Sequence, residues 1–172
     1  MYAQSPQADL LHERRSFAAA RLLDGRIVCA GEGWVSQTTA AAEILGPPVQ
    51  GAMDAVWTWR ALAPMSVARY GCGGCLLSDG RFAVLGGISN HAYTSSCEAL
   101  TFGADGHWNP LPSMHDGRVH FACAAVAECI IVAGGLRCTS AEVYDEVLGR
   151  WLRLPCGLPH SGGVYGMGSA LM

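Results

Sequence analysis

Residues 76–87 read Leu76-Leu77-Ser78-Asp79-Gly80-Arg81-Phe82-Ala83-Val84-Leu85-Gly86-Gly87. One apolar run arrives at Asp79-Gly80, and a second apolar run leaves this pair and ends at two glycines. An Asp-Gly pair between hydrophobic runs favours a β-hairpin, because Gly adopts the positive φ that tight turns require. The stretch therefore predicts two antiparallel strands joined by a tight turn.

The same pattern occurs two more times in the chain. Residues 22–31 contain the turn pair Asp24-Gly25, and residues 126–135 end at Gly134-Gly135 without an Asp-Gly turn. Other landmarks recur in the same order at intervals of 43 to 55 residues. They are an Arg (Arg15, Arg69, Arg118), a Glu (Glu43, Glu98, Glu142), a Trp (Trp59, Trp108, Trp151) and a proline-containing exit after each Trp. This order indicates an internal repeat.

An opening Arg, a hairpin ending in Gly-Gly, a strand with Glu and a Trp before a Leu-Pro exit resemble the kelch repeat, whose period is about 50 residues. The resemblance implies an all-β fold, an incomplete kelch-type β-propeller built from four-stranded antiparallel blades. The first unit departs from the pattern, since Gly31-Glu32-Gly33 stands where Gly-Gly is expected.

We expect residues 1–172 to form one partial propeller with repeats at about 15–68, 69–117 and 118–159 and an incomplete fourth repeat at 160–172. In the second repeat the expected strands are Gly71–Leu77, Arg81–Leu85, Cys97–Phe102 and Trp108–Leu111. Propellers close with about four to eight blades. The sequence is therefore expected to be a fragment, or to obtain its remaining blades from a longer chain or from another chain.

Composition excludes several classes of partner. Hydrophobic residues make up 51% of the chain, charged residues 15%, and the formal net charge is −3. No Arg-rich block is present, so nucleic acid and anionic membranes are not expected partners. The most hydrophobic segment, residues 121–136, contains Glu128 and is shorter than the about 20 residues of a membrane helix. Without a signal-peptide pattern, we expect a cytoplasmic or nuclear location.

The chain contains eight cysteines, which we expect to be free thiols in a reducing compartment. Cys72-Gly73-Gly74-Cys75 has the CxxC spacing of a redox or zinc half-site. A zinc site needs a second ligand pair, and the sequence has no second CxxC and no HxxxH. A structural role is favoured over a metal or redox role, and we expect no metal and no cofactor.

The repeated landmarks favour structural roles, because an active site usually occurs once whereas these residues recur in every unit. A buried ion pair is expected between the Arg and the Glu of a unit, since a lone carboxylate in an apolar strand is costly; catalytic carboxylates are the alternative. The Trp is expected to fill the space between blades rather than to stack on a ligand. The Gly-Gly pairs are expected to permit close backbone approach rather than to cradle phosphate. These landmarks are Arg69, Glu98, Arg118, Glu142, Trp108, Trp151, Gly86, Gly87, Gly134 and Gly135.

Functional residues are expected where the repeats differ, in the loops that follow the second strand of each unit. The candidates for contact with a partner are Trp34, Asn90, His91, Tyr93 and Arg137. Exposed aromatic and Arg side chains carry most of the binding energy at interfaces. The alternative is that these side chains only order and solvate their loops.

Three classes of function remain open at this stage. The resemblance implies a non-catalytic protein-interaction module, as the substrate-recognition part of a ubiquitin-ligase adaptor or as a cytoskeletal binder. The alternative is a galactose-oxidase-like or other sugar-acting propeller enzyme, for which Tyr93, Cys97 and His91 are the nearest copper-radical cluster. The third class is a truncated product without a function of its own.

Overall fold

The computed structural model describes residues 9–34, 37–47, 56–103, 106–155 and 157–158. These residues form three four-stranded antiparallel sheets and one two-stranded hairpin. Blade 1 contains β1 (Ala18–Arg21), β2 (Ile27–Trp34), β3 (Gln37–Gly46) and β4 (Thr58–Leu62). Blade 2 contains β5 (Gly73–Leu76), β6 (Phe82–Leu85), β9 (Cys97–Thr101) and β10 (His107–Leu111), with the hairpin β7 (Ile88–Ser89) and β8 (Ala92–Tyr93) inserted after β6. Blade 3 contains β11 (Ala122–Val126), β12 (Cys129–Ala133), β13 (Ala141–Asp145) and β14 (Arg150–Arg153).

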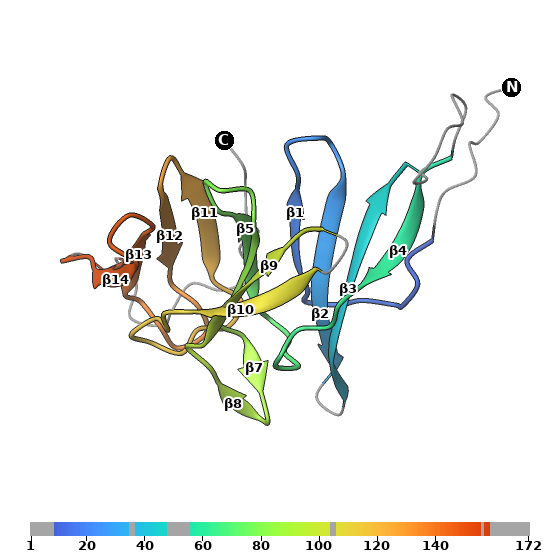
Figure 1. The fold of residues 1–172 in the computed structure, drawn as a ribbon. Helices are drawn as coiled ribbons and strands as arrows, with labels where there is room; N and C mark the ends of the chain where they lie inside the picture. The colour runs from blue at the N-terminus through green and yellow to red at the C-terminus, as the bar shows by residue number, and fades with distance from the viewer. Residues whose placement is uncertain (1–8, 35–36, 48–55, 104–105, 156, 159–172) are drawn as a thin grey trace, which may run out of the picture.

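The three blades stand side by side, as Figure 1 shows, and their first strands are neighbours. In each blade the strands are paired in chain order, from β1 to β4, from β5 to β10 and from β11 to β14. This arrangement confirms the predicted all-β fold of four-stranded antiparallel blades. Among the described residues, no helix is long and apolar enough to cross a membrane.

The hairpin predicted for residues 76–87 is present between β5 and β6. The backbone N–H of Leu77 donates to the carbonyl of Arg81 at 2.9 Å, and that of Gly80 donates to the carbonyl of Leu77 at 2.9 Å. Gly80 has a φ of +84°. Asp79 also accepts a hydrogen bond from the backbone N–H of Arg81, which secures the turn.

Two apolar clusters fill the spaces between the blades. The first joins blade 1 to blade 2 and includes Val28, Ile44, Phe82 and Leu100. The second joins blade 2 to blade 3. Each strand of blade 2 contributes to both clusters, because side chains alternate between the two faces of a sheet. The fold is therefore held together by blade-on-blade packing.

The Gly-Gly pair of the second repeat, Gly86-Gly87, lies where two backbone segments approach closely. Gly86 and Gly87 have φ values of +57° and +98°. A Cβ atom on Gly87 would lie 2.6 Å from the carbonyl oxygen of Tyr70. The N–H of Gly87 also donates to the carbonyl of Arg118 at 2.7 Å, which links blade 2 to the segment that opens blade 3. The expected backbone role of this pair is confirmed.

The connection between the second and third strands differs in each blade. In blade 1, β2 and β3 continue past a register shift between Ala30 and Glu32 and pair as far as Trp34 and Gln37. In blade 2, the connection contains the additional hairpin β7–β8, which the sequence did not predict. The predicted start of a fourth unit at residues 160–172 lies outside the described residues.

Candidate functional site

Arg69 lies at the centre of blade 2 and binds three acceptors. Its Nη1 donates to the carbonyl oxygens of Gly86 at 2.9 Å and Ser96 at 2.8 Å. Its Nη2 lies 3.0 Å from Oε1 of Glu98. Both side chains are almost fully buried. The structure thus confirms the ion pair expected for this repeat.

Blade 3 repeats this arrangement around Arg118. Its Nη1 donates to the carbonyl oxygens of Gly134 at 2.8 Å and Ser140 at 2.7 Å. Its Nη2 lies 2.9 Å from Oε1 of Glu142, and both side chains are fully buried. The same three kinds of acceptor therefore hold the arginine in both blades.

In blade 1 the arginine of this arrangement is Arg14, not Arg15 as predicted. Arg14 donates to the carbonyl oxygens of Gly31 and Ala41 and lies 2.6 Å from Glu43, whereas Arg15 is exposed. The sequence did contain evidence that favours Arg14 over Arg15. Arg14 precedes Arg69 by 55 residues, which is also the distance between Glu43 and Glu98.

The buried glutamates also connect each blade to the segment before it. Oε2 of Glu98 accepts a hydrogen bond from the backbone N–H of Ser66, which follows β4 of blade 1, at 2.8 Å. Glu142 accepts one from the N–H of His115, which follows β10 of blade 2, at 2.7 Å. Glu43 accepts one from the N–H of Leu11 at 2.9 Å. Each carboxylate is therefore bound within its own blade and by the segment that precedes that blade.

Hydrogen bonding outweighs burial in setting the pKa of Glu142. Burial alone raises the pKa of this carboxyl, but the N–H of His115, the guanidinium of Arg118 and the His115 ring lower it further than burial raises it. The resulting pKa is below the ordinary value of 4.5. The pKa of Glu43 is lowered in the same way, with His12 and Arg14 opposing the effect of burial. Both carboxyls are therefore charged at neutral pH.

The repeated tryptophans join neighbouring blades. Nε1 of Trp108 in blade 2 donates to the carbonyl of Ala63, which follows β4 of blade 1, at 2.8 Å. Nε1 of Trp151 in blade 3 donates to the carbonyl of Pro112, which follows β10 of blade 2, at 2.9 Å. The ring of Trp108 also contacts Phe82 edge-on at 6.2 Å between centroids. These contacts agree with the expected packing role between blades.

The hairpin β7–β8 presents three of the five predicted contact residues. Asn90 and His91 form its turn with φ values of +48° and +62°, and Tyr93 follows on β8. Asn and His are among the few residues that tolerate this left-handed region. All three side chains are exposed, Tyr93 to 41%. The structure therefore brings Asn90, His91 and Tyr93 together on one hairpin.

Backbone hydrogen bonds fix this hairpin to both neighbouring segments. Ile88 exchanges two backbone hydrogen bonds with Tyr70, at 2.7 and 3.2 Å. The N–H of Thr94 donates to the carbonyl of Gly87, and the N–H of Arg118 donates to the carbonyl of Thr94. The hairpin is therefore a preformed projection anchored at its base.

The other two predicted contact residues lie in the equivalent connections of blades 1 and 3. Trp34 ends β2 opposite Gln37. Arg137 is exposed with a φ of +61° between β12 and β13. Because these connections join the second and third strands of antiparallel blades, they leave the blades at the same end. Figure 1 shows β7–β8 and the far ends of β2 and β3 projecting on the same side of the molecule.

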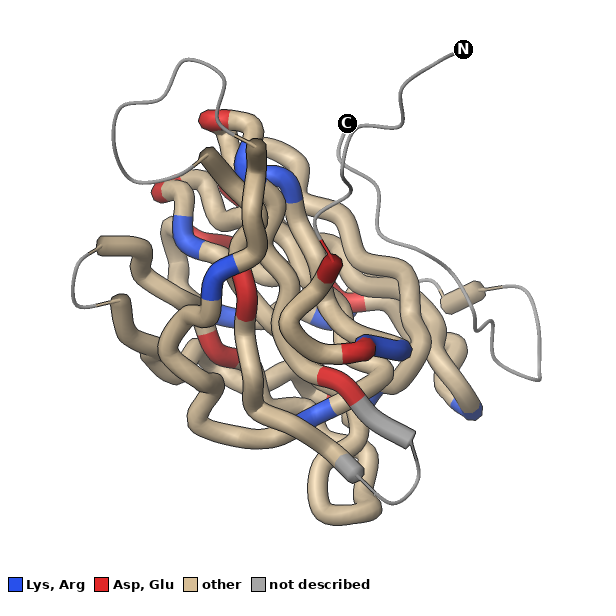
Figure 2. Tube along the Cα trace, turned by 90° about the vertical axis from the view of Figure 1, so that its right-hand side faces the viewer, with Lys and Arg blue, Asp and Glu red and all other residues tan. Residues whose placement is uncertain are grey.

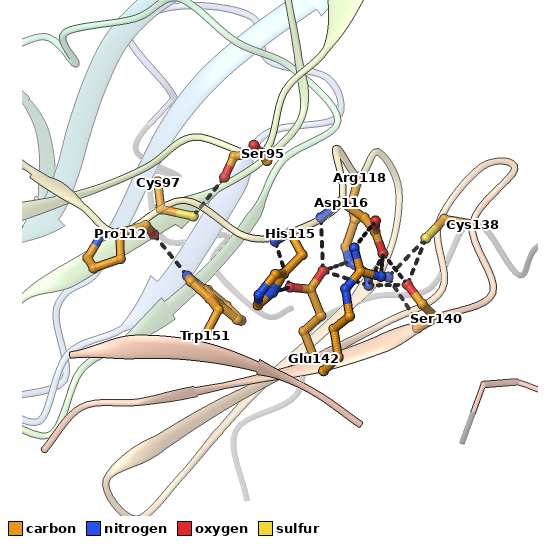
Figure 3. A network of polar contacts seen from close by, with 11 residues as sticks. Ser95, Cys97, Pro112, His115, Asp116, Arg118, Cys138, Ser140, Glu142 and Trp151 are labelled. Carbon is orange, nitrogen blue, oxygen red and sulfur yellow. Dashed lines mark hydrogen bonds and ion pairs between the residues drawn. The ribbon is translucent and has the colours of Figure 1, made fainter. Parts of the chain in front are cut away.

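Blade 3 carries a polar cluster at this end that the sequence did not reveal. Asp116 lies within hydrogen-bond distance of Ser140, at 2.6 Å, and of both terminal nitrogens of Arg153. Figure 3 shows Asp116 and Ser140 beside Arg118. The thiol of Cys138 lies 3.2 Å from Nη1 of Arg118. The hydroxyl of Ser140, assisted by Arg153, lowers the pKa of Asp116 below its ordinary value. The cluster is absent from the repeat pattern, so periodicity gave no signal for it.

The structure separates the residues of the copper-radical alternative. Tyr93 faces solvent, whereas Cys97 is 3% exposed and lies in the core between blades 2 and 3. The thiol of Cys97 donates to the carbonyl of Ser95 at 3.4 Å. Among the described residues, no group of three or more His, Cys, Asp or Glu side chains is placed to hold a metal ion. Cys72, which precedes β5, and Cys75, which lies within β5, are free thiols.

Charge is distributed without a patch of one sign on the side of the molecule that Figure 2 shows. There the positions of basic and acidic residues are interleaved along the trace. Several of these charges are paired locally, as in the surface ion pairs between Arg26 and Asp24 and between Arg81 and Asp79.

The fold is that of β-propeller blades, and comparison with known proteins shows which proteins the chain is similar to. The solved structure of YjhT superimposes with a TM-score of 0.69 at 14% identity, covering 89% of this chain and 55% of that chain. No protein-family model matches the chain. An F-box/kelch-repeat protein of Arabidopsis thaliana is 46% identical over 54 residues, which are 28% of this chain and 14% of that protein. Kelch-like protein 34 of Homo sapiens is 31% identical over 109 residues, 54% of this chain and 17% of that protein.

The chain is therefore similar in sequence to kelch-repeat proteins over up to about half of its length, and its fold is that of β-propeller blades. It spans about a sixth of the length of the curated relatives that it matches.

Proposed function

We propose that this chain is a non-catalytic protein-interaction module. Its contact surface is the loop face, which we define as the paired ends of β2 and β3 at Trp34 and Gln37, the hairpin β7–β8, and residues 136–140. The kelch-repeat relatives support a role in protein binding. The residues of the repeat itself are occupied in holding the blades, so a partner is expected to read the connections that differ between blades.

The anchored hairpin β7–β8 is the observation that supports this proposal best. Asn90, His91 and Tyr93 are exposed at the end of a projection whose base is fixed by backbone hydrogen bonds to Tyr70 and Arg118. A preformed loop loses little conformational entropy when it binds. Tyr adds a large, rigid contact area and a hydroxyl group, which is typical of residues that dominate binding energy.

Of the two finer roles that the family implies, we favour substrate recognition in a ubiquitin-ligase adaptor over binding to the cytoskeleton. The support is the F-box in the name of the Arabidopsis relative. The place of action proposed is the cytoplasm or the nucleus, which imaging of a fluorescently tagged chain would test.

The proposal is tested by quantitative mass spectrometry of proteins that co-purify with the tagged chain from cells. Tyr93→Ala and Arg137→Ala change the loop face. Leu23→Ala is the matched control, because Leu23 is 93% exposed on the turn between β1 and β2, at the opposite end of blade 1. A partner retained by the control and reduced about tenfold by Tyr93→Ala supports the proposal. If both loop-face variants retain every partner that the control retains, the proposal is wrong.

A further inference from the structure

Blades 2 and 3 bring two buried cysteines together at their interface. Cys75 lies on β5 and Cys123 on β11, the first strands of the two blades. The two strands are in contact, and Figure 1 shows them side by side. Both cysteines are free thiols in the apolar cluster that joins blade 2 to blade 3, and they are 4% and 3% exposed.

The strands β5 and β11 run in the same direction with a defined register. The N–H of His120 donates to the carbonyl oxygen of Gly71 at 2.9 Å, just before the two strands begin. Further along, a Cβ atom on Gly73 would lie 3.1 Å from Cβ of Cys123. Cys75 follows Gly73 by two residues and is therefore on the same face of β5. The register thus places Cys75 beside Cys123 across the blade boundary.

The two thiols also interact with each other. The hydrogen bond between the side chains of Cys75 and Cys123, together with burial, raises the pKa of the Cys75 thiol well above the ordinary value of 9.0. A hydrogen bond raises the pKa of the group that donates it, because only the protonated form can donate. The Cys75 thiol is therefore the donor, and the sulfur of Cys123 is the acceptor.

Neither cysteine belongs to the repeated pattern. Counted from the buried arginine of each blade, Cys75 corresponds to Ala20 of blade 1. Counted in the same way, Cys123 corresponds to Gly74 of blade 2. Packing of two blades in this register therefore does not require sulfur. Among the three described blades, the pair of thiols is specific to the interface between blades 2 and 3.

We propose that Cys75 and Cys123 form a dithiol switch, which hydrogen peroxide oxidises to a disulfide that covalently links blade 2 to blade 3. In the first step the deprotonated sulfur of Cys123 attacks peroxide, so that an S–O bond forms and the O–O bond breaks. The departing hydroxide combines with the proton lost from Cys123 and leaves as water.

In the second step the sulfur of Cys75 attacks the sulfenic acid formed on Cys123. The S–S bond forms and the S–O bond breaks. The departing hydroxide takes the proton of the Cys75 thiol and leaves as a second water molecule. Two thiols and one peroxide thus give one disulfide and two water molecules, with two electrons transferred from sulfur to oxygen.

Cys97 lies in the same cluster but is not placed to pair with Cys75. Cys97 is on β9, and β6 lies between β5 and β9 in the sheet of blade 2. Strands separated by one other strand lie about 9–10 Å apart. The Cα atoms of a disulfide are less than about 7 Å apart. Cys123 is therefore the partner that the fold provides for Cys75.

Burial determines when this switch reacts. A covered thiol is inert, so oxidation requires blades 2 and 3 to open locally at their boundary. Once formed, the disulfide prevents the two blades from separating. The same boundary holds the base of the hairpin β7–β8, where the N–H of Arg118 donates to the carbonyl of Thr94. The inference does not depend on the proposed function.

The test is treatment of the folded, reduced 172-residue chain with hydrogen peroxide. The remaining thiols are then alkylated, and the chain is digested without reductant for mass spectrometry. We expect a peptide pair linked through Cys75 and Cys123 that dithiothreitol separates. We also expect the oxidised chain to melt about 5–10 °C higher than the reduced chain. Cys75→Ala and Cys123→Ala should each lose both the linked pair and the rise in melting temperature.

Cys97→Ala is the matched control, because Cys97 is 3% exposed in the same cluster and is separated from Cys75 by β6. The control is expected to form the linked pair and to show the same rise in melting temperature. Four results would overturn the inference: oxidation of other thiols without this link, a link from either cysteine to a different one, a link without a rise in melting temperature, or a link that forms only in urea-unfolded chain.

Discussion

Glu98 accepts a hydrogen bond from Arg69 of its own blade and another from the backbone N–H of Ser66 in the segment that leaves blade 1. The carboxylate therefore joins blade 2 internally and connects it to blade 1. Burial of the Arg69 guanidinium is compensated by hydrogen bonds to Glu98 and to the carbonyl oxygens of Gly86 and Ser96, and burial of the Glu98 carboxylate by Arg69 and the N–H of Ser66. The repeated Arg and Glu thus stabilise each blade and link it to the segment before it.

Arg69→Met is expected to destabilise the protein by about 3–5 kcal/mol, because it leaves the buried carboxylate of Glu98 without its charged partner. The measurement is urea denaturation followed by circular dichroism. Arg81→Met is the control, since Arg81 pairs with Asp79 on the surface, where such pairs contribute about 1 kcal/mol or less. Equal losses in the two variants would contradict the role assigned to Arg69.

Trp151→Phe is expected to reduce the free energy of unfolding by about 1–3 kcal/mol, because it removes the hydrogen bond to the carbonyl of Pro112 in the preceding blade. Trp151→Ala should cost about 3–5 kcal/mol, as is typical of truncating a large core side chain. The control is Trp57→Phe, since Trp57 is 40% exposed and is expected to tolerate the change within about 0.5 kcal/mol. Denaturant titration distinguishes these outcomes.

Acidification is expected to lower the free energy of unfolding, because it protonates Glu142 and Glu43. The pKa values of both carboxyls are lower in the folded state than the ordinary 4.5. At and below that pH the unfolded chain therefore binds more protons, so stability is full above about 4.5 and is lost as pH falls through the folded pKa. Stability curves of wild type and Glu142→Gln should converge as pH drops below 4.5. A gap between the curves that is constant with pH would contradict this assignment.

The rate at which a cysteine is labelled is expected to be lower the more deeply its thiol is buried. Burial raises the pKa of the Cys29 and Cys97 thiols to about 11, and both side chains are almost fully covered. Cys129 and Cys138 are partly exposed. Iodoacetamide at mildly alkaline pH should modify Cys129 and Cys138 before Cys29 and Cys97, since the thiolate is the reactive form and must be accessible. Mass spectrometry of digests measures the order, and rapid labelling of Cys29 in the folded protein would contradict the packing of blade 1.

Replacing Asn90 and His91 together by Gly should remove two side chains from the loop face without loss of stability. Both residues have positive φ, which Gly adopts at little cost. His91→Val is the contrasting variant, because a β-branched residue is strained at a φ of +62°. Thermal unfolding should show little change for the double Gly variant and a lower melting temperature for His91→Val. The reverse order would contradict the geometry of this turn.

The blades could be predicted from the sequence because their signals are local and periodic. Asp79-Gly80 specifies a turn, and Gly86, Glu98 and Trp108 recur at the same relative positions, so strand order and the buried ion pairs followed. Arg15 was the wrong choice in blade 1 because two arginines are adjacent, and only their distances to Arg69 distinguish them. Neighbouring sequence alone does not show which of the two enters the core.

The structure of the loop face was harder to predict from the sequence. The hairpin β7–β8 was missed because Asn90-His91 makes its turn without the Gly that usually marks one, and because its strands contain two residues each. The cluster of Asp116, Ser140 and Arg153 joins side chains that are far apart in the chain and occur once. Non-repeated contacts of this kind are fixed by tertiary packing, which periodicity does not report.

Amide hydrogen exchange tests most directly the claim that the three blades are joined into one cooperative unit. The informative amides cross blade boundaries: Gly87 to Arg118, Glu32 to Arg69, Ser66 to Glu98 and His115 to Glu142. We predict that these four exchange as slowly as the central strands β6 and β12, because opening them requires blades to separate. Fast exchange at these amides, with protected strands inside each blade, would show that the blades open independently and would contradict the account.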